Sequence, residues 1–168
     1  MITVASTVGQ GTTFTLYFPA AAASAPASPA PAAPLAIERA QAFGHGRKVM
    51  IIDDDEGVLR LGRAILKLVE FAPEEFAHPA DALDKFKRDP QGYAAIISDL
   101  TMPGMTGIEL ARRCRAIRPD IPFVLTSGYL DVQTQGGAQE SGITHFIRKP
   151  FDIAEFTSKL RSALERNR

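Results

Sequence analysis

The sequence predicts an α/β domain in which a doubly wound parallel sheet of five strands lies between two layers of helices. From Arg47 onward, short apolar runs alternate with segments of helical periodicity, as they do in successive βα units. Three of these runs end in charged residues, at Asp53, Asp99 and Lys149. Because the carboxyl ends of parallel strands meet at one edge of a sheet, we expect these charges to lie close together.

Two βα units open the predicted sheet. An apolar run predicts a strand over 48–53, and the helix after it is expected at about 57–70. A weaker strand is expected near 74–77. Its helix begins near Pro79, because proline is favoured at the first helical position, and stops at Pro90. The apolar residues expected on one side of the first helix are Val58, Leu61, Ile65, Leu68 and Val69.

The next two strands are the clearest in the chain. Strand 94–99 leads to a helix that starts at Thr106, where Thr106 and Glu109 have the spacing of a capping box. This helix ends before Pro119, and the fourth strand is expected at about 121–126.

The last part of the domain contains a weak element. The polar segment 131–142 includes Gly136 and Gly137, and an interior glycine costs a helix about 1 kcal/mol relative to alanine. We therefore expect a short or labile helix there. The fifth strand is expected at 143–148, and a final helix after Asp152 buries Phe156, Leu160 and Leu164.

The N-terminal part of the chain differs in composition from the rest. Residues 1–34 contain no Asp, Glu, Lys or Arg, and residues 20–34 consist only of Ala, Pro and Ser. Because each interior proline costs a helix about 3 kcal/mol, we expect a semi-stiff, partly extended linker. Residues 2–18 are rich in β-forming side chains and are split by Gly9-Gln10-Gly11, which predicts a β-hairpin.

Composition narrows the possible partners. Acidic and basic residues balance at 19 each in 168 residues, so bulk charge gives no reason to expect nucleic acid or a membrane surface. No apolar run approaches the roughly 18 residues of a membrane span, and the N-terminus does not have the pattern of a signal peptide. Cys114 is the only cysteine, which excludes an intrachain disulfide and favours a reduced, cytosolic setting.

The acids at the strand ends suggest phosphoryl chemistry. A buried carboxylate such as Asp99 is a poor nucleophile unless its partner is very electrophilic, as a phosphoryl group neutralised by a metal is. Asp53 and Asp54 supply further carboxylate oxygens on the neighbouring strand, and Mg²⁺ prefers such ligands. Taken alone, the acidic run could equally be a solvated turn that stabilises the following helix electrostatically.

Three motifs that follow expected strands decide between these interpretations. They are DLTMPGMTG at 99–107, TSG at 126–128 and KPF at 149–151. In this order, each after a strand, they resemble the receiver domain of two-component response regulators over about residues 47–166. The resemblance implies a (βα)5, flavodoxin-like receiver fold.

The resemblance also implies a role for each acid. Asp99 would be the phosphoacceptor and would take its phosphoryl group from a phosphohistidine. Asp54 would coordinate Mg²⁺ directly and Asp53 mainly through water, and the backbone carbonyl of Thr101 matches the third protein ligand. Asp55 is expected to be only a turn acid.

Further residues match the positions that respond to phosphorylation. Ser127 would hydrogen-bond a phosphoryl oxygen, with Thr126 as second choice. Lys149 would pair with the acids and then with the phosphoryl oxygens, and the Lys149–Pro150 peptide is expected to be cis. Phe146 occupies the position of the switch aromatic, although it could also be a plain core phenylalanine.

The N-terminal segment carries a second resemblance. Residues 6–19, STVGQGTTFTLYFP, look like the last strands of the ATP-binding domain of sensor histidine kinases, without its nucleotide-binding segments. The order of segments is then that of a hybrid histidine kinase: a kinase remnant at 1–19, a linker at 20–46 and a receiver at 47–168. The phosphohistidine donor would be its own kinase or a histidine phosphotransfer protein.

Other functions are weighed against this one. A phosphohydrolase with an Asp-x-Asp motif would need a second acid where Thr101 stands. A receiver-like module that only binds partners would be expected to lack some of the acids or the lysine. A DNA-binding response regulator would need a further domain, for which the sequence leaves no room. The resemblance implies that the receiver catalyses only its own phosphorylation and that the catalytic core of the parent kinase is absent from this sequence. Whether the chain counts as an enzyme is therefore left open.

Overall fold

A computed structural model describes residues 2–17, 42–128 and 142–165. The chain divides into two compact units, residues 1–37 and residues 38–168, and each is described by itself. The predicted linker at 20–34 lies outside the described residues, as does the predicted weak helix at 131–142 except for its last residue.

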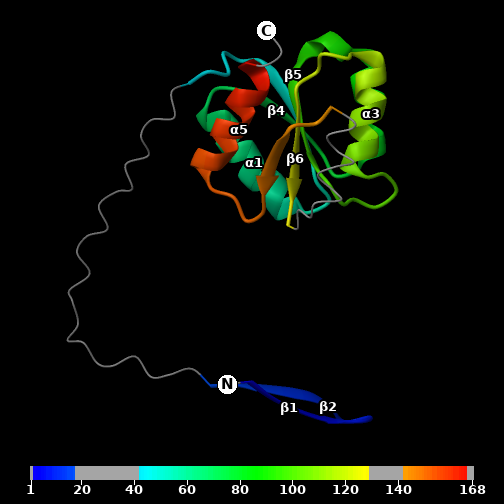
Figure 1. Ribbon diagram of the computed structural model, residues 1–168, viewed down its shortest axis with the longest axis vertical. Coiled ribbons are helices and arrows are strands. Elements are labelled where there is room, and N and C mark those ends of the chain that lie inside the picture. The colour runs from blue at the N-terminus through cyan, green and yellow to red at the C-terminus, as the bar shows by residue number, and fades with distance from the viewer. Residues whose placement is uncertain (1, 18–41, 129–141, 166–168) are drawn as a thin grey trace, which may run out of the picture. The chain divides into compact units, whose positions relative to one another are not determined.

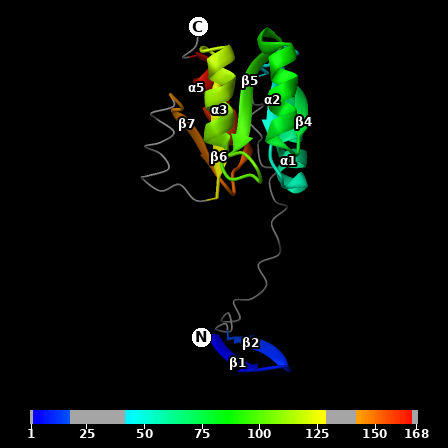
Figure 2. The ribbon, with the colours of Figure 1, turned by 90° about the vertical axis from the view of Figure 1, so that its right-hand side faces the viewer.

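The second unit is a five-stranded parallel sheet, as the sequence predicts. Its strand order is β4-β3-β5-β6-β7. Helices lie on both of its faces (Figures 1 and 2). Its elements are β3 (Lys48–Ile52), α1 (Glu56–Leu68), β4 (Ala72–Phe76), α2 (Pro79–Arg88), a 3-10 turn η1 (Pro90–Gly92), β5 (Tyr93–Asp99), α3 (Gly107–Ile117), β6 (Phe123–Ser127), β7 (His145–Arg148) and α5 (Ile153–Glu165).

The central strands are buried on both faces. On β3, Met50 and Ile52 join the cluster under α2 and α3, whereas Val49 and Ile51 join the cluster under α1 and α5. Each strand therefore reads as a continuous apolar run, and polar side chains are confined to its ends. This burial pattern places the charged residues at the edges of the sheet.

The buried face of α1 differs from the predicted one. Ile65 and Val69 are buried as expected, but Leu61 and Leu68 are each 45% exposed. The face that meets the sheet is centred on Gly62, where an added Cβ would lie 2.1 Å from the Ile51 Cδ1 atom. The apolar stripe on α1 is wider than its contact with the sheet, so the two leucines fall outside the contact.

Side chains in the loops cap the helices. The Asp55 carboxylate accepts hydrogen bonds from the backbone N–H groups of Gly57 and Val58, at 2.6 and 3.1 Å. The Thr106 hydroxyl accepts one from the Glu109 N–H at 3.2 Å, as its spacing predicts. Asp55 is thus the N-cap of α1, in line with its expected place as a turn acid.

The first unit contains the predicted hairpin. Strands β1 (Ile2–Thr7) and β2 (Gly11–Leu16) pair in antiparallel register, with Ile2 opposite Leu16 and Val4 opposite Phe14. These four side chains share one face of the hairpin and are all more than half exposed. Among the described residues, no helix is both long enough and apolar enough to cross a membrane.

Gly107, the first residue of α3, tests how tightly this helix packs on the sheet. A Cβ at this position would lie 2.3 Å from the Asp99 carbonyl oxygen and 2.7 Å from Leu125 Cδ2. We expect Gly107→Ala to lower the free energy of unfolding by about 1–3 kcal/mol, as overpacking does. The matched variant Gly128→Ala meets no atom within 4 Å and should stay within about 0.5 kcal/mol of wild type in urea unfolding. Equal stabilities would contradict this packing.

Candidate functional site

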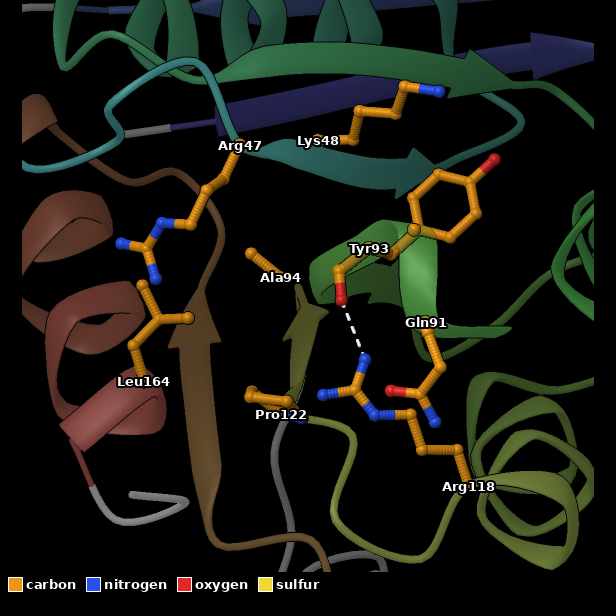
Figure 3. Close-up of a pocket in the computed structure, with 9 residues that line it drawn as sticks. Arg47, Lys48, Gln91, Tyr93, Ala94, Arg118, Pro122 and Leu164 are labelled. Atoms are coloured by element: carbon orange, nitrogen blue, oxygen red, sulfur yellow. Dashed lines mark hydrogen bonds between the residues drawn. The ribbon is translucent and has the colours of Figure 1, made fainter. Parts of the chain in front are cut away.

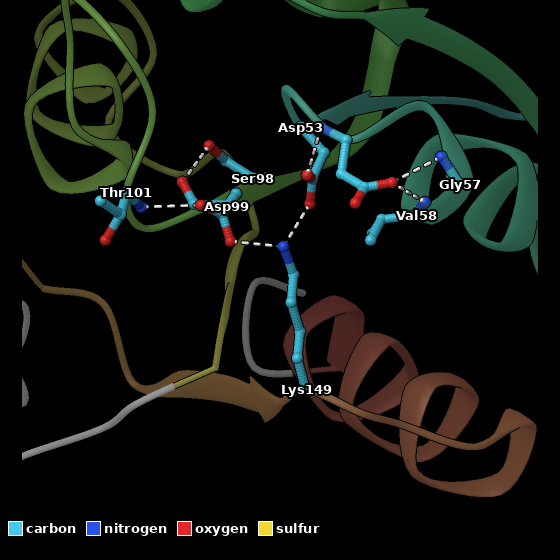
Figure 4. A network of polar contacts seen from close by, with 8 residues as sticks. Asp53, Gly57, Val58, Ser98, Asp99, Thr101 and Lys149 are labelled. Atoms are coloured by element: carbon cyan, nitrogen blue, oxygen red, sulfur yellow. Dashed lines mark hydrogen bonds and ion pairs between the residues drawn. The ribbon is translucent and has the colours of Figure 1, made fainter. Parts of the chain in front are cut away.

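Three charged side chains meet at the carboxyl edge of the sheet. Asp53 follows β3, Asp99 is the last residue of β5, and Lys149 follows β7. The Lys149 Nζ atom lies 2.6 Å from Asp53 Oδ2 and 2.6 Å from Asp99 Oδ1 (Figure 4). The expected meeting of these charges is therefore observed, with the ammonium group between the two carboxylates.

The two carboxylates are held by backbone groups as well. Asp99 Oδ2 accepts a hydrogen bond from the Thr101 N–H at 2.8 Å, and Asp53 Oδ1 accepts one from the Asp55 N–H at 3.0 Å. Each carboxylate thus contacts Lys149 through one oxygen and the turn that follows its own strand through the other. Their orientation is fixed before any ligand arrives.

Burial of these charged groups shifts their pKa values. Asp53 is 1% exposed, and burial raises its pKa above the ordinary value, as does the charge of Asp99, although hydrogen bonds from Lys149 and from the Asp55 N–H oppose the rise. Burial alone would lower the pKa of Lys149, but its hydrogen bonds to both carboxylates outweigh burial and raise the pKa. One ammonium balances only one of the two carboxylates, so the site favours a further cation.

The three acids that follow β3 have different environments. Asp53 is buried in the cluster and Asp55 caps α1, whereas Asp54 is exposed. Among the described residues, no group of three or more His, Cys, Asp or Glu side chains is arranged to hold a metal ion. The Lys149 ammonium lies between the two buried carboxylates.

The chemistry of the donor set nevertheless fits Mg²⁺. All candidate ligands are oxygens: the carboxylates of Asp53, Asp54 and Asp99 and the backbone carbonyl of Thr101, an exposed residue. The excess negative charge at the cluster also suits a small divalent cation. We therefore regard these residues as able to hold Mg²⁺.

The remaining predicted residues lie on the two strands beside this cluster. Ser127, the last residue of β6, is 4% exposed, and its carbonyl accepts a hydrogen bond from the Lys149 N–H at 2.7 Å. Thr126 is also buried and lies opposite Asp99 in the ladder. Phe146 on β7 is half-buried and packs against the cluster under α2 and α3. The Lys149–Pro150 peptide is cis, as predicted.

One polar residue next to the cluster was missed in the sequence. The Ser98 hydroxyl donates a hydrogen bond to the Asp99 carbonyl oxygen at 2.9 Å, and Ser98 is fully buried. The available signal was a hydroxyl inside an otherwise apolar strand. Periodicity could not use that signal, because it does not tell which partner a buried hydroxyl finds.

A pocket of about 320 Å³ lies at the opposite edge of the sheet (Figure 3). Arg47 and Lys48 at the start of β3 line it, together with Arg118, which donates a hydrogen bond to the Tyr93 carbonyl oxygen at 2.7 Å. The residues that line this pocket include no carboxylate and none of the predicted site residues. It is therefore separate from the acid cluster.

Comparison with known proteins places the sequence among signalling proteins. The family model for the response regulator receiver domain matches residues 49–161. The C4-dicarboxylate transport transcriptional regulatory protein DctD of Rhizobium meliloti is 35% identical over 120 residues, 71% of this chain and 26% of DctD. Sensor kinase CckA of Brucella abortus is 28% identical over 163 residues, 96% of this chain but 17% of CckA.

Solved structures agree on the fold. The CheX–CheY–BeF3–Mg²⁺ complex from Borrelia burgdorferi contains a chain that matches with a TM-score of 0.65 and 23% identity, over 68% of this chain and 87% of that chain. This likeness shows the flavodoxin-like receiver fold that the sequence predicts.

The raised pKa of Asp53 predicts a pH-dependent stability. The folded domain binds the Asp53 proton more tightly than the unfolded chain, so ionisation of Asp53 destabilises the fold as pH rises above 3.8. Asparagine cannot ionise, so Asp53→Asn should gain stability relative to wild type as pH rises. The difference in free energy of unfolding, variant minus wild type, should grow from about pH 3.5 and level off above the raised pKa of Asp53. Urea unfolding in EDTA measures this, with the exposed Asp81→Asn on α2 as control for the loss of one carboxylate. A difference that shrinks with pH would refute the prediction.

Proposed function

Because this chain belongs to the response regulator receiver domain family, we propose that it accepts a phosphoryl group from a phosphohistidine onto Asp99. The observation that carries the proposal is the environment of the Asp99 carboxylate. It lies at the carboxyl edge of the sheet, with one oxygen on Lys149 and the other on the Thr101 N–H. Asp53 is held by similar contacts, but it follows β3, whereas Asp99 is the last residue of β5 and is the residue that matches the phosphoacceptor position.

The proposed transfer is a simple displacement. An Asp99 carboxylate oxygen forms a bond to phosphorus while the bond between phosphorus and the donor's imidazole nitrogen breaks. The electron pair of that bond returns to the imidazole nitrogen, which takes up a proton from solvent. Lys149 already lies 2.6 Å from Asp99 Oδ1 and offsets negative charge that gathers on the transferred group.

Mg²⁺ is the cofactor that this site would use. Asp54, Asp53, Asp99 and the Thr101 carbonyl would hold the ion. When bound, Mg²⁺ supplies positive charge against the phosphoryl oxygens. The all-oxygen donor set supports this proposal. So does the similar Borrelia burgdorferi structure, which is described as a complex with Mg²⁺.

The response to phosphorylation is assigned to Ser127 and Phe146. Ser127 ends the strand between β5 and β7, so its hydroxyl can turn toward a phosphoryl group on Asp99. Phe146 is only half-buried, so an inward movement would bury the part of its ring that is now exposed. Because phenylalanine has no hydroxyl, a readout of this switch would depend on burial of the ring rather than on a new hydrogen bond.

The parent protein is proposed to be a hybrid histidine kinase. The match to CckA extends over 96% of this chain and so reaches into the N-terminal hairpin as well as covering the receiver domain. Residues 1–19 would then be the end of the kinase ATP-binding domain, 20–46 the linker and 47–168 the receiver. The donor would be its own kinase or a histidine phosphotransfer protein.

The charge balance and the single cysteine support the proposed setting. With 19 acidic and 19 basic residues, the chain is not proposed to bind nucleic acid or to contact a membrane through this segment. Cys114 is free and buried, and a chain with a single cysteine has no intrachain disulfide to maintain, which fits the proposed cytoplasmic location.

Phosphotransfer tests the proposed function. Wild type, Asp99→Asn and the exposed control Asp81→Asn are each mixed with a radiolabelled phosphohistidine protein or with acetyl phosphate, in Mg²⁺. We expect label on wild type and Asp81→Asn and none on Asp99→Asn, because an amide cannot form the acyl phosphate. Absence of label on wild type with every donor, or equal label on Asp99→Asn, would refute the proposal.

A further inference from the structure

A buried hydroxyl lies directly beside Asp99. Ser98 is fully buried on β5, and its neighbours in the ladder are Ile52 on β3 and Leu125 on β6. Burying a hydroxyl among apolar side chains is unfavourable unless it forms a hydrogen bond. The Ser98 hydroxyl donates to the Asp99 carbonyl oxygen at 2.9 Å (Figure 4).

This hydrogen bond fixes one end of the peptide group that joins Asp99 to Leu100. The other end is fixed as well, because the Leu100 N–H donates to the Thr126 carbonyl oxygen at 2.9 Å. The start of α3 packs against the Asp99 carbonyl oxygen, since a Cβ at Gly107 would lie 2.3 Å from it. The peptide plane is therefore held by Ser98 on one side and by β6 on the other.

The orientation of this peptide decides how the Asp99 side chain is held. The next peptide along the chain carries the Thr101 N–H, which binds Asp99 Oδ2 at 2.8 Å. If the Asp99–Leu100 peptide rotated, the Thr101 N–H would move away from the carboxylate. The carboxylate would then keep Lys149 as its partner and lose the backbone contact that sets its direction.

We propose that Ser98 is a positioning residue for phosphoryl transfer, which acts by holding the Asp99–Leu100 peptide and through it the Asp99 carboxylate. This inference rests on the proposed function of Asp99. Ser98 does not touch the phosphoryl group; it sets the angle from which Asp99 attacks. Reactions of this kind depend strongly on such alignment, and a misplacement of 1 Å can cost roughly a hundredfold in rate.

Three variants separate positioning from packing. Ser98→Ala removes the hydroxyl. Ser98→Thr and Ser98→Val give side chains of similar shape, of which threonine keeps the hydroxyl and valine has a methyl group in its place. Each is first shown to be folded by circular dichroism and urea unfolding. The rate of phosphorylation is then measured by intact-protein mass against acetyl phosphate concentration in saturating Mg²⁺.

We expect the maximal rate of Ser98→Ala to fall roughly tenfold, with an unchanged acetyl phosphate concentration at half-maximal rate, because the donor binds on the solvent side of Asp99. Ser98→Thr should keep more of the rate than Ser98→Val. Wild-type rates in Ser98→Ala, or equal rates in the Thr and Val variants, would overturn the positioning role. If wild type itself is not phosphorylated, the proposed function fails instead, and so the two failures are distinguishable.

Discussion

The contact between the Lys149 ammonium and the buried carboxylates of Asp53 and Asp99 is the interaction on which the site depends. Two unit charges about 4 Å apart interact by about 4 kcal/mol at an effective dielectric constant near 20, so two unpaired carboxylates at the ends of β3 and β5 would repel each other. Lys149 bridges them across the sheet from the end of β7. Its backbone N–H is in turn held by the Ser127 carbonyl on β6. Four strands are thus joined at the edge where the chemistry is proposed.

The surrounding fold confines the charged side chains to this edge of the sheet. The central strands are buried on both faces, so side chains that face the helices are apolar and the charges can lie only at strand ends. The loop after β3 contributes both to the acid cluster and to the stability of α1. Of its three consecutive acids, Asp53 joins the buried cluster, Asp54 is exposed, and Asp55 caps α1. Neighbouring residues of the same type thus serve the site and the fold separately.

Much of this architecture follows from the sequence, because strand burial and strand-end chemistry leave clear patterns. The parallel sheet, the meeting of Asp53, Asp99 and Lys149, and the Thr106 cap were all predictable from residue type and spacing. The buried face of α1 was not, because Gly62 lets the helix approach Ile51 and moves Leu61 and Leu68 out of the contact.

The hydrogen bond of Ser98 was also beyond prediction, since it depends on the local direction of one carbonyl group. Likewise, spacing placed Lys149 near the acids but could not show that its ammonium lies between them, where a metal ion would compete with it. Both features depend on the orientation of single polar groups within about an ångström, and hydrophobic periodicity carries no such information.

Magnesium binding to a variant without the ammonium tests the central claim most directly. If Lys149 neutralises the carboxylates that would also hold Mg²⁺, the two cations compete. Isothermal titration of Mg²⁺ should then give tighter binding to Lys149→Met than to wild type, with the exposed Lys67→Met on α1 binding as wild type does. Equal or weaker Mg²⁺ binding by Lys149→Met would contradict the claim that this ammonium balances the charge of the site.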